Sequence, residues 1–471
     1  MNRRLALPWL ALLAACGGGS SAASAVGGAG SSGTAGMSVP LSGSGGEGGL
    51  LLGTAGAWAG STDAGGSDRG GATGGSGGGT AGFDASAGNI GRGGAGAQGG
   101  GGATSVAGAA GVTGAAGANA LPSRASVLEL MHRANTYFVA KWPDPGKAID
   151  SSHSSQIWTR AVYYEGLMGL YGIDPQPSEL SYAVDWGTSH AWGLNGGATT
   201  RSADNQCAGQ TYLDLYEIDP QAARIKDIQA DIDRVVAGAA VDDWTWVDAI
   251  QMAMPVFAKL GAINSSTAYF EKMYAMYSSA KNTQGAAGFY SKIDHLWWRD
   301  ANFDPPYTEP NGKNCYWSRG NGWVFAALTR VLGTIPESES HRAEYLADFN
   351  AMAEALRAVQ RSDGFWNVSL LDPTHFGGPE LTGTSLFAYG MAWGVRNGVL
   401  SADGYLPVVK RAWTAMASAV HEDGFLGYVQ GTGQQPSDGQ PVTFDKLPNY
   451  EDFGLGCFLL GASEVARLAP P

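Results

Sequence analysis

The sequence YGIDPQ at residues 171–176 returns as YEIDPQ at residues 216–221, an offset of 45 residues. Each copy follows one stretch with a helical spacing of apolar residues and precedes another. The Pro in each copy can close one helix and open the next. A repeat of this length is typical of stacked supersecondary units. It therefore predicts an array of helical hairpins.

Helical patterns continue through the chain beyond residue 123, whereas the alternating patterns typical of strands are almost absent. We expect an all-α fold of twelve helices, arranged as six hairpins. Such an array is either an open solenoid, which needs capping repeats, or a closed ring, which does not. The residues alone leave both forms open. The expected helices span residues 125–141, 156–172, 178–191, 203–217, 221–238, 245–260, 264–279, 319–333, 341–360, 382–398, 403–419 and 450–468.

The start of the chain resembles an export signal. Arg3 and Arg4 precede an apolar run at 5–13, which ends in LAAC at residues 13–16. This run is far shorter than the roughly 20 residues needed to span a bilayer. Small residues before Cys16 resemble a bacterial lipobox, so we interpret residues 1–15 as a lipoprotein signal peptide and Cys16 as the lipidation site. An ordinary signal peptide with an incidental Cys is the alternative.

Residues 16–121 are dominated by Gly, Ala and Ser. Such a segment cannot bury enough apolar surface to offset its ordering entropy, so we expect a disordered tether with an r.m.s. span of roughly 50–60 Å. No Asp follows Cys16, and an Asp there would resemble an inner-membrane retention signal. We therefore expect an exported lipoprotein of the outer membrane, facing the periplasm or the cell surface. Its membrane partner would be reached through the lipid anchor.

The formal net charge of the chain is −13. An acidic balance argues against nucleic acid as a partner, and no protein partner is indicated. It also provides no bulk attraction for an anionic sugar, so a few local cations would have to bind one.

Three cysteines remain beyond the tether, at Cys207, Cys315 and Cys457. They are far apart and match no zinc spacing. Buried free thiols are expected, with one disulfide and one thiol as the alternative.

The heptad WSRGNGW at residues 317–323 combines an Arg with two Trp among glycines. Arg offers a planar fork to a carboxylate, and Trp offers a flat face to a sugar ring. A helix N-terminus with packed Trp side chains would give the same pattern. Trp317, Arg319 and Trp323 are therefore candidates for binding an acidic sugar.

Two Asp residues are candidates for acid–base chemistry. Asp248 and Met252 lie four residues apart and share one helix face, with Trp246 beside them. A carboxyl group desolvated in this way has a raised pKa, as general acid catalysis near neutral pH requires. Asp204 falls at another predicted helix start. A helix-start Asp can also be only a cap or a favourable charge for the helix dipole.

Taken together, these motifs resemble glycoside hydrolase family 105, the unsaturated rhamnogalacturonyl hydrolases, and the neighbouring family 88, the unsaturated glucuronyl hydrolases. The resemblance runs from about residue 125 to the end, and it implies that residues 122–471 form a closed six-hairpin (α/α)6 barrel. The WSRGNGW heptad is its most specific element. Further matching stretches are WTRAVYYEG at 158–166, DGFW at 363–366, ELTGTS at 380–385 and NYEDFG at 449–454.

The resemblance also implies a role for each candidate. Asp248 matches the catalytic Asp and Asp204 the second active-site Asp, although this chain has Asn205 where the family often has a second acid. Arg319 would hold the sugar carboxylate, and the remaining pocket residues would surround the uronate. These are Trp246, Met252, Trp317, Trp323 and, less securely, His295, for which simple packing among Trp residues is the alternative.

The implied reaction removes a terminal 4,5-unsaturated uronate from fragments left by polysaccharide lyases, of rhamnogalacturonan first of all. Most glycosidases use two carboxyl groups across the anomeric carbon, but these families hydrate the C4=C5 double bond instead, without a cofactor or a metal. An unsaturated glucuronyl hydrolase acting on other uronate oligosaccharides is one alternative. A glycan-binding surface lipoprotein that has lost catalysis is another.

Overall fold

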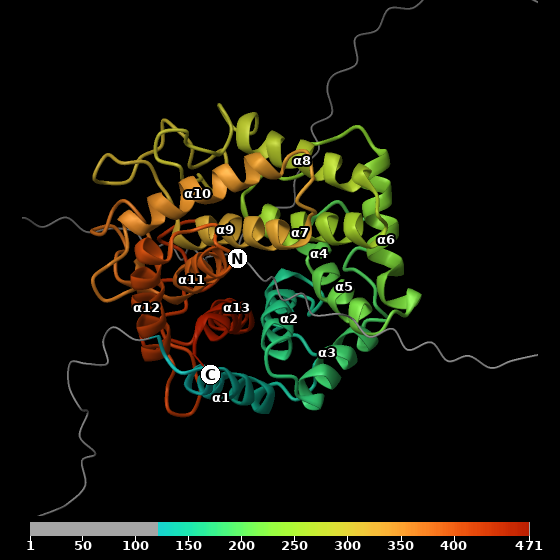
Figure 1. Cartoon of the computed structure of the whole chain (residues 1–471), viewed down its shortest axis with the longest axis horizontal. Helices are drawn as coiled ribbons and strands as arrows, with labels where there is room; N and C mark the ends of the chain where they lie inside the picture. The colour runs from blue at the N-terminus through green and yellow to red at the C-terminus, as the bar shows by residue number, and fades with distance from the viewer. Residues whose placement is uncertain (1–120, 471) are drawn as a thin grey trace, which may run out of the picture. The chain divides into compact units, whose positions relative to one another are not determined.

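The computed structural model describes residues 121–470 (Figure 1). In this part of the chain, each predicted helix is confirmed, with its ends within three residues of those expected. The helix expected at 203–217 is divided at Cys207, where Gln210 N–H donates to the carbonyl three residues earlier. The helices are α1 (Arg124–Lys141), α2 (Trp158–Tyr171), α3 (Pro177–Ser189), α4 (Ala203–Gln206), α5 (Ala208–Ile218), α6 (Ala222–Ala237), α7 (Asp248–Ile263), α8 (Thr267–Asn282), α9 (Ser318–Thr334), α10 (Arg342–Ala358), α11 (Leu381–Arg396), α12 (Ala402–Ser418) and α13 (Asp452–Leu468).

The hairpins close into a ring (Figure 1). Helices α2, α5, α7, α9, α11 and α13 form an inner circle in which each packs against the next, and α4 precedes α5. The outer helices pack on this circle: α1 on α13, α3 on α2, α6 on α5, α8 on α7, α10 on α9 and α12 on α11. Closure occurs where α13 meets both α2 and α1. The described residues thus form the closed six-hairpin barrel, and the open solenoid does not apply to them.

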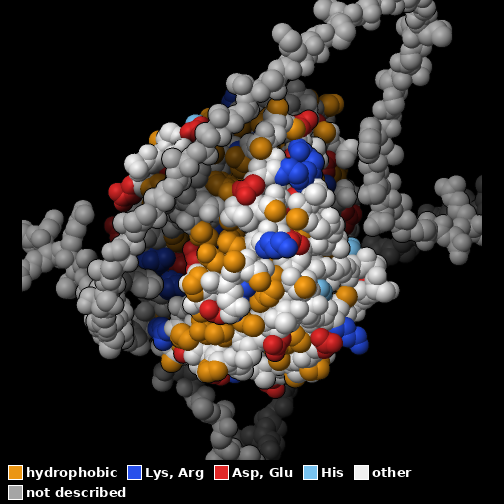
Figure 2. Space-filling model, turned by 90° about the vertical axis from the view of Figure 1, so that its right-hand side faces the viewer, with side chains coloured by type: hydrophobic (Ala, Val, Ile, Leu, Met, Phe, Trp, Pro, Cys, Tyr) orange, Lys and Arg blue, Asp and Glu red, His pale blue; other side chains and the backbone are white. Residues whose placement is uncertain are grey.

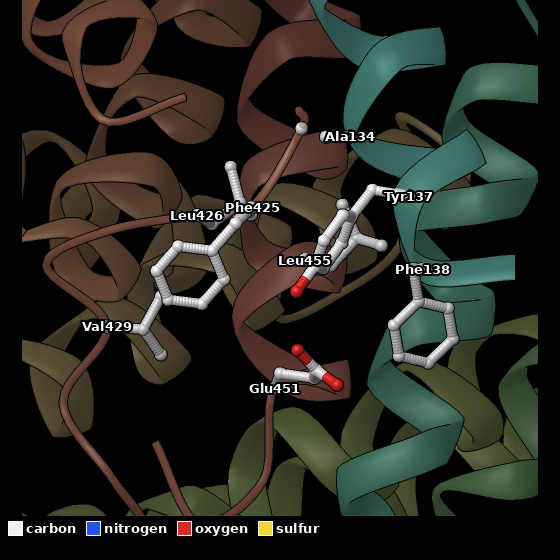
Figure 3. A pocket seen from close by; sticks show the side chains of 9 residues that line it. Ala134, Tyr137, Phe138, Phe425, Leu426, Val429, Glu451 and Leu455 are labelled. Carbon is white, nitrogen blue, oxygen red and sulfur yellow. The ribbon is translucent and has the colours of Figure 1, made fainter. Parts of the chain in front are cut away.

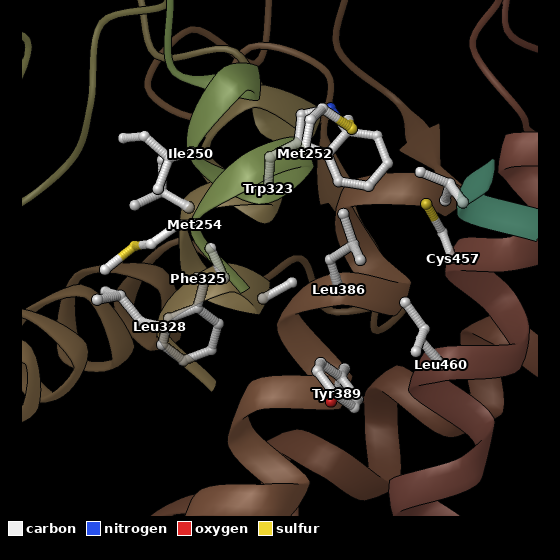
Figure 4. Close-up of a cluster of buried hydrophobic side chains, with 14 of the residues drawn as sticks. Ile250, Met252, Met254, Trp323, Phe325, Leu328, Leu386, Tyr389, Cys457 and Leu460 are labelled. Atoms are coloured by element: carbon white, nitrogen blue, oxygen red, sulfur yellow. The ribbon is translucent and has the colours of Figure 1, made fainter. Parts of the chain in front are cut away.

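The inner helices differ from the outer ones in how much of their surface is buried. In α11, each residue from Leu381 to Gly394 is buried, whereas α12 buries one face only. A helix that is apolar all round belongs in a core, and an amphipathic helix belongs at its surface. Figure 4 shows side chains of α7, α9, α11 and α13 meeting in this core. At Gly166, a Cβ atom would lie 2.5 Å from the Gly456 carbonyl oxygen, so α2 and α13 approach more closely than a larger residue permits.

A short two-stranded antiparallel sheet lies between α10 and α11. Strands β1 (Trp366–Asn367) and β2 (Pro379–Glu380) pair with Trp366 opposite Glu380. Glu380 then caps α11, because its carboxylate accepts hydrogen bonds from the N–H groups of Thr382 and Gly383 at 2.9 and 2.7 Å. The sheet therefore sets where the chain enters the inner circle.

The three cysteines are free and buried, as the preferred interpretation of their odd number predicted. On the face seen in Figure 2, cationic, anionic and hydrophobic side chains are interspersed. Within residues 121–470, none of the helices combines the length and the apolar character needed to cross a bilayer. The predicted signal peptide, Cys16 and tether lie outside the described residues.

Candidate active site

A pocket opens at the end of the barrel where the inner helices begin. It encloses about 320 Å³, open solvent at its mouth included. Its walls come largely from the starts of α2, α4, α7 and α9, and the N-termini of the long helices α2, α7 and α9 carry partial positive charge that favours an anion. The lining residues are Trp158, Asp204, Trp246, Asp248, Met252, Arg299, Trp317, Arg319, Trp323 and Gly433.

Asp248 is the first residue of α7, three residues later than the predicted helix start. Its side chain is buried, with 12% of its surface exposed. Burial raises the pKa of Asp248, and the nearby charges of Arg299 and Arg319 oppose this effect without cancelling it. A buried carboxyl group that can carry a proton and faces a cavity has the properties of a general acid.

Asp204 lines the same pocket from α4. Burial raises its pKa to about 7, the charge of Asp248 adds to this effect, and Arg299 opposes it. Asn205 takes no part in the pocket lining, because its side chain bonds to Asn195 and Thr200 at 3.0 Å each. Asn205 therefore stabilises the preceding loop, which contains Asn195 and Thr200.

Arg299 reaches Asp248 across a short antiparallel contact. The N–H of Val247 donates to the Arg299 carbonyl at 2.9 Å, and Trp246 pairs with Asp300 in an isolated β-bridge. The guanidinium donates through Nε to Asp248 Oδ2 at 2.9 Å and through Nη1 to Asp300 Oδ2 at 2.5 Å. The backbone pairing thus places a cation against the carboxylate at the start of α7.

Arg319 also lines the pocket, but its guanidinium is held by the protein. Its Nη1 and Nη2 donate to the carbonyls of Gln430 and Gly431 at 2.8 Å each. The group lies 4.5 Å from the centre of the Trp317 ring and 5.0 Å from that of Phe453. The Arg319 guanidinium, which was expected to bind a sugar carboxylate, therefore binds mainly the loop that carries Gly433.

Aromatic side chains form much of the remaining wall. Trp158 and Trp323 meet edge to face with ring centres 6.4 Å apart. The indole N–H of Trp317 donates to Gln430 Oε1 at 2.8 Å, which fixes this ring against the same loop. Large rings that cannot turn are suited to stacking on a sugar.

The structure brings seven of the eight predicted pocket residues together and leaves His295 out of the lining. The His295 ring instead lies 3.0 Å from the Tyr290 hydroxyl through Nδ1. His295 has a positive φ of 56°, so it sits in a tight turn. This placement favours the alternative of simple packing, and a role at the site stays a prediction.

Three lining residues were not candidates in the sequence. Trp158 opens the stretch WTRAVYYEG, which supports the family resemblance as a whole. Arg299 follows the adjacent pair Trp297-Trp298. A cation directly after a Trp pair was the available signal for Arg299. Gly433 lies in a loop with no distinctive pattern, so nothing in the sequence marked it.

A second cavity lies at the closure of the ring, between α1, the segment 424–429 and the start of α13 (Figure 3). Its lining is apolar apart from Glu451 and the Tyr137 hydroxyl. Glu451 accepts hydrogen bonds from Trp142 Nε1 at 2.7 Å and from Lys141 Nζ at 3.1 Å. Its carboxylate is thus engaged in joining α1 to α13. In residues 121–470, no group of three or more His, Cys, Asp or Glu is placed to hold a metal ion.

Comparison with protein families gives a match along most of the barrel. Residues 130–469 match the family described as Glycosyl Hydrolase Family 88. A solved structure described as a glycosyl hydrolase family 88 protein from Bacteroides vulgatus is 33% identical. Its TM-score is 0.67, and the match covers 74% of this chain and 99% of the other.

Two curated proteins are similar over a shorter region. An unsaturated 3S-rhamnoglycuronyl hydrolase of Formosa agariphila is 36% identical over 230 residues, which cover 48% of this chain and 58% of that protein. A protein of the same name from an Alteromonas species is 35% identical over 222 residues, covering 47% of this chain and 51% of that protein. The matched region thus spans little more than half the length of these curated relatives.

Proposed function

This chain belongs to glycosyl hydrolase family 88, and on that premise we propose that it removes a terminal 4,5-unsaturated uronate from oligosaccharides. The observation that carries the proposal is the pocket in which Asp248, Asp204 and two arginines meet between Trp rings. The pocket joins a buried carboxyl group with a raised pKa, cationic groups for an acidic sugar and flat faces for its ring. The seven predicted residues that line it support the same chemistry.

The proposed reaction is the hydration of the C4=C5 double bond. Asp248 donates a proton to C4 as general acid, and water adds at C5 with the resulting Asp248 carboxylate as general base. The C5 hemiketal then opens, and the glycosidic bond breaks. Asp204 fixes sugar hydroxyl groups or tunes Asp248. The helix N-termini around the pocket favour the sugar carboxylate.

We propose rhamnose as the sugar that follows the uronate. The printed names of the two curated relatives describe rhamnoglycuronyl hydrolases, and both are at least 35% identical to this chain over their matched regions. The alternative substrate is another uronate oligosaccharide, of the kind on which unsaturated glucuronyl hydrolases act. Both substrates present the same unsaturated uronate to the pocket and differ only at the next sugar.

A panel of lyase-generated unsaturated oligosaccharides tests the proposal. We expect turnover of rhamnose-linked substrates, followed as loss of the ultraviolet absorbance of the conjugated double bond. In a control, Asp248→Asn should lose this absorbance about 10²–10⁴-fold more slowly, and saturated counterparts, which lack the chromophore, should release no sugar. Binding of these sugars without any loss of absorbance would show a non-catalytic glycan-binding protein instead.

We further propose that the enzyme is exported and held in the outer membrane by a lipid on Cys16. The support is the sequence pattern at residues 13–16 and the Gly-rich segment that follows it. Changing Cys16 to Ala should abolish both lipid labelling and membrane association. Labelling that survives this change would remove the anchor from the proposal. A chain of residues 122–471 should melt in one sharp transition and retain turnover of soluble substrates.

A further inference from the structure

The two cations of the pocket are held in different ways. Arg319 is 1% exposed and gives two of its nitrogen atoms to main-chain carbonyls. The side chain of Arg299 is 17% exposed and is held by two carboxylates, Asp248 and Asp300. Carboxylate partners can be exchanged for another anion, whereas the carbonyls that hold Arg319 are fixed parts of a loop. Arg299 is thus the cation that an entering carboxylate can reach.

The partner that Arg299 would give up is the proposed acid itself. A general acid must carry a proton before it acts, but a cation bonded to Asp248 favours its ionised form. The other charged groups around Asp248 are Asp204 from α4, Asp300 beside Arg299, and Arg319 from α9. Asp300 is buried and also accepts a hydrogen bond from the Asn302 N–H, so it can keep its place when the guanidinium turns.

We propose that Arg299 exchanges Asp248 for the carboxylate of the incoming uronate, so that binding of the substrate prepares Asp248 to act as an acid. Loss of the cationic partner lets the Asp248 carboxylate take up one proton from water. This proton is the one later delivered to C4. The inference rests on the proposed function and makes Arg299 a positioning residue that also selects anionic sugars.

The exchange has a signature in the pH dependence of the rate. The basic limb of the pH profile of kcat/KM reports the pKa of Asp248 in the free enzyme. The basic limb of the pH profile of kcat reports the pKa of the same group in the complex. We expect the kcat limb of the wild type to lie about one pKa unit or more above the kcat/KM limb. One unit corresponds to about 1.4 kcal/mol of differential interaction. A substrate whose carboxylate is methyl-esterified should bind poorly and should show no separation of the limbs.

Substitutions at Arg299 separate this exchange from a direct effect of the substrate's charge. Arg299→Gln should lower kcat/KM roughly 10–100-fold and remove the separation of the limbs. Arg299→Lys keeps the charge and should preserve the separation at a reduced rate. Arg201→Gln is the matched control, because Arg201 pairs with Asp243 outside the pocket lining, and it should behave as the wild type.

A separation that persists in Arg299→Gln would overturn the inference, because the substrate would then act on Asp248 without Arg299. If Arg299→Gln does not fold, the wild type carries the test, and equal separations for acid and ester substrates overturn it. Failure of the proposed function is distinct from both outcomes. In that case the wild type turns over no unsaturated uronate at all.

Discussion

Among the buried acids of the barrel, Asp248 and Glu165 can be compared directly, and of these two only Asp248 lines the active-site pocket. Asp248 lies at the start of α7 in the open end of the ring, and Glu165 lies within α2. Burial raises the pKa of both, and an arginine opposes it in each case: Arg299 for Asp248 and Arg330 for Glu165. A raised pKa therefore does not by itself mark a catalytic group in this molecule.

The two acids differ in what satisfies their oxygen atoms. The oxygens of Glu165 accept hydrogen bonds from Cys207 Sγ at 3.3 Å and from Gln251 Nε2 at 2.8 Å. Arg330 adds a charge 3.9 Å away, and the side chain of Glu165 is fully buried. Asp248 keeps part of its surface in a cavity walled by Trp rings. The difference indicates that access to a ligand, and not burial, separates the proposed catalytic acid from the structural one.

The largest expected effect is the loss of turnover on removing the pocket acid. Asp248→Asn keeps the shape of the side chain but cannot donate the proton, so kcat should fall by about 10²–10⁴-fold. Steady-state rates on an unsaturated disaccharide measure this loss. Thermal unfolding should change little. A variant with near-normal turnover would remove Asp248 from the mechanism and end the contrast with Glu165.

The matching change at the structural acid should affect folding and leave the chemistry intact. Glu165→Ala leaves Cys207, Gln251 and Arg330 without their buried acceptor, and breaking such a pair costs roughly 3–5 kcal/mol. Denaturant unfolding measures this loss. Glu165→Gln keeps the volume and one acceptor, so it should lose less. Below the melting temperature both variants should keep a kcat near that of the wild type, and a collapse of kcat in a folded variant contradicts this.

The two arginines of α9 differ in the same way, because Arg319 lines the pocket and Arg330 does not. Arg319→Ala removes the donors that hold Gln430 and Gly431 at the pocket, so kcat/KM should fall roughly 10–100-fold. Arg319→Lys should recover only part, because Lys lacks the planar fork. Arg330→Ala, eleven residues further along the same helix, should lower stability but not kcat. Arg319→Ala should still prefer the free acid to the methyl ester, and equal turnover of both would show that Arg319 holds the carboxylate.

The smallest expected effect is a pH-dependent change in stability at Asp204. Its folded-state pKa is raised to about 7, above the ordinary value of 3.8, so the folded protein binds this proton more tightly than the unfolded chain. The contribution of Asp204 to the stability of the wild type should therefore fall as the pH rises from about 4 through about 7. Asp204→Asn cannot ionise, so its melting temperature relative to the wild type should rise over the same window. A difference in melting temperature between Asp204→Asn and the wild type that stays constant across this pH window would contradict the raised pKa of Asp204.

The helices, and the candidates for much of the pocket lining, follow from local sequence patterns. Helix spans follow from the spacing of apolar residues, which is a local property, and the YGIDPQ repeat marks the hairpin period. Trp317, Arg319 and Trp323 of the WSRGNGW heptad and Asp248 of the 246–252 stretch lie in the pocket lining. These residues lie within two turns of a helix start, so local signals were enough to find them.

The remaining residues of the site come together through contacts between segments that are remote in the chain. Arg299 meets Asp248 because a backbone pairing joins segments 51 residues apart, and helical spacing carries no information about such a contact. The same reason explains Trp158, which reaches the pocket through the closure of the ring. His295 is instead held locally, by a turn that keeps its ring against Tyr290. Whether an acid is paired or open to a ligand is likewise set by neighbours that are remote in the chain. That property separates Asp248 from Glu165.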